Sequence, residues 1–96
     1  MRYVTITTWE TTSGADYDLA LRSVREKRLP ALREMGASRV TVVRTSDRTS
    51  AVITEWPDEM TRDAAEAAIA AVRDKVRRED MIRMTGEMKG AVVAEV

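Results

Sequence analysis

The chain has 96 residues, of which 44% are apolar and 33% charged, and its 16 basic and 16 acidic side chains cancel at neutral pH. This composition predicts one folded domain over residues 1–96, without the basic surface that binds nucleic acids or anionic membranes. The sequence contains no His, Cys, Asn, Gln or Phe. Because the usual transition-metal ligands and the thiolate nucleophile are missing, we expect no disulfide, no metal and no cofactor.

The first residues alternate apolar and polar side chains, whereas a signal peptide needs a continuous apolar run. No segment approaches the roughly 18 apolar residues of a membrane span. Abundant Arg and Ala, with no Asn or Phe, are typical of a GC-rich bacterial genome. We therefore expect a bacterial, cytoplasmic protein.

The first half of the chain reads as a strand followed by an interrupted helix. Residues 3–9 are β-branched and aromatic with a period of two, which predicts a strand. Asp16 is placed to cap a helix that begins near Tyr17. Because proline removes a helix hydrogen bond, we expect a kink or restart at Pro30 and a short second segment ending at Gly36.

The second half begins with a hairpin. Two alternating runs, residues 39–45 and 49–56, are joined by a short polar link. A second helix is expected after a cap at Asp58 or Thr61. Its buried stripe would comprise Ala65, Ala68, Ile69, Val72 and Val76.

The chain end completes the predicted topology. Residues 81–90 are ambiguous, and a final strand, apolar on both faces, is expected over residues 91–96. The order strand, helix, strand, strand, helix, strand is typical of the α+β ferredoxin-like βαββαβ fold. Right-handed crossovers give a four-stranded antiparallel sheet in the order 4-1-3-2, with two helices on one face. The other face also reads as apolar, so we expect a second copy of the chain to cover it.

Two segments carry a resemblance to known proteins. Residues 30–37, PALREMGA, resemble a helix that closes on Gly before strand 2, and residues 53–59, ITEWPDE, resemble a strand 3 that closes on Trp and acidic residues. Together with the order and spacing of nearly the whole chain, they make it similar to the dimeric α/β-barrel superfamily. That superfamily includes antibiotic-biosynthesis-type and haem-degrading monooxygenases, stress-responsive proteins, small isomerases and ligand-sensing domains. The resemblance implies a homodimer whose two sheets pack into a barrel.

The resemblance also implies two alternative functions. One is a cofactor-independent monooxygenase-like or isomerase-like protein that acts on a small hydrophobic molecule of aromatic or polyketide type. The other is a non-catalytic ligand-binding or structural dimer. Haem-degrading members use an Asn late in strand 1, a Trp in helix 2 and a His. Here Thr7 stands near the Asn position, helix 2 has no Trp and the chain has no His, so haem degradation is not expected.

Strand 1 supplies most of the candidate substrate-binding residues. Tyr3, Thr5, Thr7 and Trp9 share one face, where they either line a pocket with an aromatic floor or simply fill the sheet face. Trp56, at the end of strand 3, is either a core plug or a pocket wall. Tyr3, Thr7, Trp9 and Trp56 are therefore taken as candidates.

Two charged features, Arg44 and the run of charges over residues 22–28, each have a functional and a purely structural interpretation. Arg44, the fifth candidate, could meet Glu55 across the hairpin and bind a carboxylate or polarise a carbonyl, or the two could form an exposed cross-strand pair. Residues 22–28 carry five charges in seven positions, which favours a solvated helix face over a phosphate site.

Overall fold

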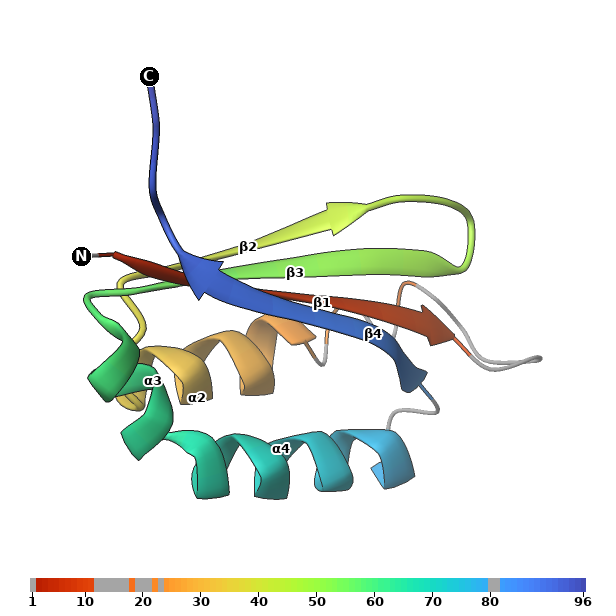
Figure 1. Cartoon of the computed structure of the whole chain (residues 1–96). Coiled ribbons are helices and arrows are strands. Elements are labelled where there is room, and N and C mark those ends of the chain that lie inside the picture. The colour runs from red at the N-terminus through yellow and green to blue at the C-terminus, as the bar shows by residue number, and fades with distance from the viewer. Residues whose placement is uncertain (1, 12–17, 19–21, 23, 80–81) are drawn as a thin grey trace.

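The structure is a computed structural model that describes residues 2–11, 18, 22, 24–79 and 82–96. The elements are β1 (Tyr3–Thr11), η1 (Val24–Arg28, a π-helical turn), α2 (Leu29–Glu34), β2 (Arg39–Arg44), β3 (Thr49–Trp56), α3 (Glu59–Ala64), α4 (Glu66–Glu79) and β4 (Ile82–Ala91). The strands form one antiparallel sheet in the order β2-β3-β1-β4. The α-helices cover one face of it (Figure 1). The predicted ferredoxin-like topology is confirmed.

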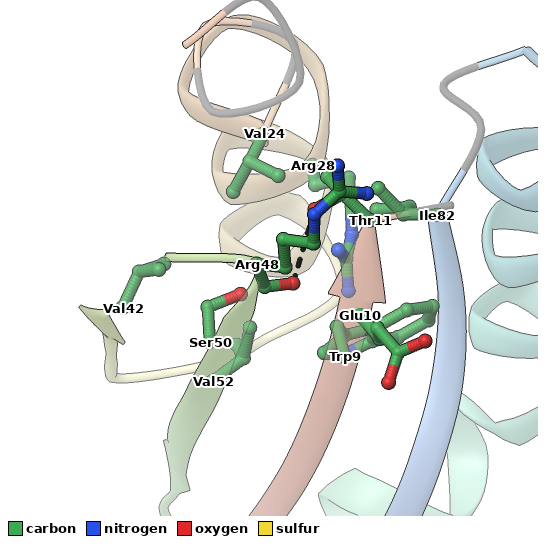
Figure 2. Close-up of a pocket in the computed structure, with 10 residues that line it drawn as sticks. All are labelled: Trp9, Glu10, Thr11, Val24, Arg28, Val42, Arg48, Ser50, Val52 and Ile82. Atoms are coloured by element: carbon green, nitrogen blue, oxygen red, sulfur yellow. Dashed lines mark hydrogen bonds between the residues drawn. The ribbon is translucent and has the colours of Figure 1, made fainter. Parts of the chain in front are cut away.

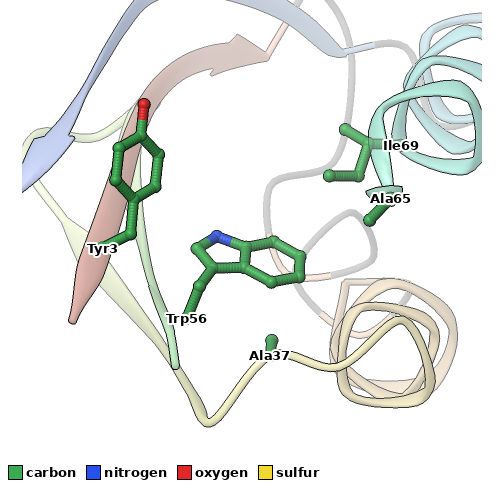
Figure 3. Packing of buried hydrophobic residues seen from close by; sticks show 5 residues of the cluster. All are labelled: Tyr3, Ala37, Trp56, Ala65 and Ile69. Carbon is green, nitrogen blue, oxygen red and sulfur yellow. The ribbon is translucent and has the colours of Figure 1, made fainter. Parts of the chain in front are cut away.

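The alternation in β1 assigns its side chains to the two faces of the sheet. Tyr3, Thr5, Thr7 and Trp9 are buried, while the residues between them are half-buried. Trp56 is fully buried and packs in one cluster with Tyr3 and the helix residue Ile69 (Figure 3). The odd-numbered face of β1 therefore faces the helices, and the even-numbered face is the open one.

The restart at Pro30 is confirmed. The π-helical turn η1 runs directly into α2, with Pro30 in the first turn of α2, where a missing N–H costs least. The chain leaves α2 at Gly36, which has a φ of 110°. A Cβ atom there would lie 2.8 Å from Cγ2 of Thr61, so both the backbone and the space favour glycine. The predicted helix start at Asp16 and Tyr17 lies outside the described residues.

The second predicted helix is two helices, α3 and α4, separated by a turn at Ala65. Of the predicted stripe, Ala65 and Ile69 are buried and Val72 is half-buried. Ala68 is exposed, so that part of the prediction was wrong. The side chain of Val76 lies outside the described part of the chain. None of the described helices is long and apolar enough to cross a membrane.

Asp58 is the cap of α3, as one of the two predicted alternatives had it. Its Oδ1 accepts hydrogen bonds of 2.7 Å from both the backbone N–H and the hydroxyl of Thr61. The Thr61 hydroxyl and then its N–H hold the pKa of the Asp58 carboxyl below its usual range.

We expect Asp58→Ala to lower the melting temperature by a few degrees at neutral pH, because α3 loses its cap. A carboxyl whose pKa is lowered by folding contributes fully above the pKa of an unfolded aspartate, about 4, and loses that contribution as the pH falls through its lower folded pKa. Thermal melts of both proteins should therefore converge at acidic pH. A difference that stayed constant down to the acid limit would contradict the assigned role of the carboxylate.

The position of the last strand was predicted wrongly. Strand β4 spans Ile82–Ala91, and residues 92–96 form no strand but leave the sheet on the side away from the helices (Figure 1). The pairing of β1 with β4 shifts register between Thr8 and Trp9. Gly86 lies opposite this irregularity, and a Cβ atom there would lie 2.9 Å from the Thr8 hydroxyl. Because Gly86 has no side chain, it permits the close approach of β1 and β4 at this point.

The centre of the open face is apolar even without residues 92–96. Ile6 of β1 is paired with Ile53 of β3 and Met88 of β4. Val43 and Met88 are 42% and 65% exposed. The sheet therefore presents an uncovered apolar surface in the isolated chain.

Candidate functional site

Trp9 lies on the helix-facing side of the sheet, in a buried cluster with Val52 and Ile82. Its side chain is 3% exposed, and its indole N–H donates a 2.8 Å hydrogen bond to the Thr7 hydroxyl. Trp56 makes the equivalent bond, of 3.2 Å, to the Thr5 hydroxyl. A hydroxyl that accepts from an indole keeps its own O–H to donate. Both threonine hydroxyls are therefore available as donors inside the molecule.

Arg28 is a buried cation beside Trp9. Its guanidinium carbon lies 4.1 Å from the centroid of the Trp9 ring, and the residue is 5% exposed. This geometry is that of a cation–π contact in a largely water-free setting, where it is strongest. Arg28 occupies this position because η1 ends there, immediately before the Pro30 restart.

Two small cavities flank Arg28. The first has a volume of about 20 Å³ and lies at the C-terminal end of β1, where the Thr11 hydroxyl donates a hydrogen bond to the Arg48 carbonyl (Figure 2). The second encloses about 30 Å³ and is lined by the hydroxyls of Thr5 and Thr7 as well as by Arg73. A space of this size holds about one water molecule. The interior is thus nearly filled in this conformation, with Arg28 and Val52 in the walls of both cavities.

A larger groove opens on the other side of Trp9, between α4 and β4. It has room for about 410 Å³, and its walls include Arg73, Arg83 and Met84. Trp9 lines both this groove and the first cavity, and Arg73 lines both the groove and the second. A ligand in the groove would consequently lie beside Trp9 and Arg73, the residues that the groove shares with the two cavities.

Ion pairs hold the arginines of this region. Arg73 lies 2.7 Å from Glu87 of β4, and Glu87 is 4.0 Å from the buried guanidinium of Arg62. Arg62 also bonds Glu66, and that hydrogen bond together with its charge lowers the pKa of Glu66. Two buried nitrogens of Arg62, Nε and Nη2, have no hydrogen bond to the described residues. The network ties α3 and α4 to β4, so it fixes the wall that carries Arg73.

The structure brings four of the five candidate residues to the same side of the sheet. Tyr3, Thr7, Trp9 and Trp56 all face the helices. Trp9 lines the groove, and Thr7 lines the second cavity. Trp56 belongs to the packed core and also lines the second cavity, and Tyr3 belongs to the packed core. Trp9 is therefore the candidate that a ligand in the groove would contact.

Arg44 lies elsewhere. It pairs with Ser50, and its guanidinium donates to the carbonyls of Ser46 and Asp47 in the exposed hairpin turn, at 3.2 and 3.1 Å. The predicted contact with Glu55 was wrong, because the register places Glu55 opposite Arg39. Participation of Arg44 in ligand binding stays a prediction.

Sequence reasoning missed two residues of the site, Arg28 and Arg73. Arg28 falls on the otherwise apolar stripe of its helical segment, and a charged residue on a buried stripe was the available signal. Arg73 carries no such signal, since it joins the site only through the packing of α4 against β4. Among the described residues, no group of acidic side chains is arranged to hold a metal ion.

No protein-family model matches this chain, and no curated protein sequence matches it. Solved structures do match. HapK from Hahella chejuensis has a TM-score of 0.75 and 15% identity, covering 100% of this chain and 96% of its own. SnoaB from Streptomyces nogalater, a cofactor-independent oxygenase, has a TM-score of 0.71 and 19% identity, covering 100% and 98%.

A third match is a dimeric ferredoxin-like protein from an uncultured marine organism. Its TM-score is 0.70 and its identity 15%, over 99% of this chain and 90% of its own. The chain therefore has the ferredoxin-like fold that is also found in a dimeric ferredoxin-like protein and in a cofactor-independent oxygenase, as the sequence resemblance predicted.

Proposed function

We propose that this protein is a homodimer that binds a small hydrophobic aromatic molecule beside Trp9 and oxidises it without a cofactor. The observation that carries the proposal is the position of Trp9, which forms a wall of both the 410 Å³ groove and the interior cavity. An aromatic ligand in the groove would stack or pack on the indole. That SnoaB is a cofactor-independent oxygenase with this fold supports the chemistry.

In such a reaction the substrate supplies all the electrons. A substrate CH2 group that reacts with dioxygen would lose two C–H bonds and gain a C=O, while the second oxygen atom leaves as water. The protein would contribute binding, exclusion of water and donors for negative charge that develops on substrate oxygen. Donor side chains that line the second cavity belong to Thr5, Thr7, Thr54, Arg28 and Arg73, and of these Arg73 also lines the groove.

A second candidate function is a non-catalytic ligand-binding or structural dimer. It is favoured by the small interior cavities, each with space for about one water molecule. It is also favoured by the position of the carboxylates, since a substrate C–H needs a base: among the described residues, none lines the cavity beside Thr7, and Asp74 lines only the groove.

Dioxygen uptake separates the two candidates. With aromatic phenols as substrates, we expect an oxygen electrode to record uptake above the spontaneous rate for the wild type. Trp9→Leu should reduce that excess at least about tenfold, because a binding wall worth more than 1.4 kcal/mol is lost. Met60→Leu, an exposed change on α3, is the matched control. Quenching of tryptophan fluorescence without uptake would favour a non-catalytic ligand-binding dimer, and the absence of both signals would leave only the structural dimer.

The proposed dimer rests on the open apolar face of the sheet. Ile6, Ile53 and Met88 form its centre, and packing against a second sheet would remove them from water. The dimeric ferredoxin-like protein of the same fold supports this assembly.

A further inference from the structure

A second groove lies on the outside of the molecule, between η1, α2 and the edge strand β2. It has room for about 450 Å³ and shares no lining residue with the groove beside Trp9. Three arginines line it, one from each element: Arg25, Arg33 and Arg39. None of the described residues that line it is acidic. In a chain whose total charge is zero, this is a local concentration of positive charge.

The local fold makes this concentration. Arg33 lies in the last turn of α2, and the chain then reverses at Gly36, whose φ is 110°. A 3.2 Å hydrogen bond from the N–H of Ala37 to the carbonyl of Leu32 closes the helix end. Because β2 begins only three residues after Gly36, Arg39 and Arg33 become walls of the same groove.

Glu55 of β3 offsets part of the charge of one of the three arginines. It lies 3.9 Å from the Arg39 Nε atom and 3.3 Å from the guanidinium of Arg2, which also pairs with Glu95. The Arg39 side chain is 75% exposed, and Arg25 and Arg33 are exposed as well. Three arginines line one groove, and a multiply charged anion bound there would be attracted by all three.

The shape and the remaining lining define the class of ligand. Guanidinium groups present paired N–H donors that match two oxygens of a phosphate. Leu29, Pro30 and Val40 supply apolar walls beside the arginines. We propose that this groove binds a small molecule that carries a di- or triphosphate group and an apolar portion. The site is additional to the function proposed above and does not depend on it.

Isothermal titration calorimetry with inorganic tripolyphosphate at low ionic strength tests the site on the full chain. The wild type should bind. Arg33→Gln/Arg39→Gln should weaken binding about tenfold or more, because exposed charge-assisted contacts to two phosphates are lost. Lys75→Gln/Lys89→Gln removes the same charge from exposed positions elsewhere and should change affinity less than about twofold.

Two results would overturn the proposal. One is a wild type that binds no tripolyphosphate, and the other is an equal loss of affinity in both double variants, which would show an unspecific effect of net charge. The altered side chains are exposed, so melting temperatures should match the wild type. If the first double variant proves unfolded, Arg25→Gln alone should still weaken binding severalfold while Lys75→Gln does not.

Discussion

Replacing Trp56 with Ala should lower the free energy of unfolding by about 3–5 kcal/mol, the usual cost of deleting a large buried aromatic side chain. The Trp56 side chain is 0% exposed and packs between Tyr3 of the sheet and Ile69 of α4 (Figure 3). The substitution leaves a cavity in the centre of the core, and Thr5 also loses its hydrogen bond from the indole. Because small domains have a total stability of about 5–15 kcal/mol, much of the margin would be lost.

Urea denaturation followed by circular dichroism measures this effect. Trp56→Phe keeps most of the buried area and should cost less, about 1–2 kcal/mol, for the lost hydrogen bond and the smaller ring. Met60→Ala, at a position that is 80% exposed, should be nearly neutral. A loss below about 1 kcal/mol for Trp56→Ala would show that the core does not depend on this residue as the structure indicates.

Introducing a charge on the open sheet face should dissociate the proposed dimer. Ile6 lies at the centre of that face, paired with Ile53 and Met88 on the neighbouring strands. In Ile6→Glu a carboxylate would be buried without a partner at the interface, which costs several kcal/mol. We expect the dissociation constant to rise at least about 100-fold, since each 1.4 kcal/mol corresponds to a factor of ten.

Sedimentation equilibrium at micromolar concentration detects this change. The wild type should be a dimer, because we expect two open sheet faces in contact to bury about 1,600 Å², the size of a standard stable interface. Ala67→Glu adds the same charge on the exposed face of α4 and should leave the dimer intact. A wild type that is monomeric at tens of micromolar would contradict the proposed assembly, and an Ile6→Glu dimer of unchanged affinity would place the interface elsewhere.

The sequence determined the order of elements, the sheet topology and the face of β1 that is buried. These follow from local patterns: the period-two alternation of residues 3–9, the restart at Pro30 and the cap at Asp58. The sequence pattern placed the last strand at residues 91–96 instead of Ile82–Ala91, because Gly86 and Gly90 weaken a strand signal as much as a helix signal. Gly86 is accommodated by the approach of Thr8 from a strand nearly 80 residues away in sequence, which no local pattern contains.

The candidate site was predictable only where one strand supplied it. Thr7 and Trp9 share a face by alternation alone, whatever the rest of the chain does. Arg28, the cation over Trp9, comes from η1, and Arg73, which lines both the groove and the second cavity, comes from α4. The register of the hairpin separates Arg44 from Glu55. Local periodicity thus determined which face each side chain occupies. Only the tertiary structure decided which charges meet there, because such contacts depend on helix packing and strand register between distant segments.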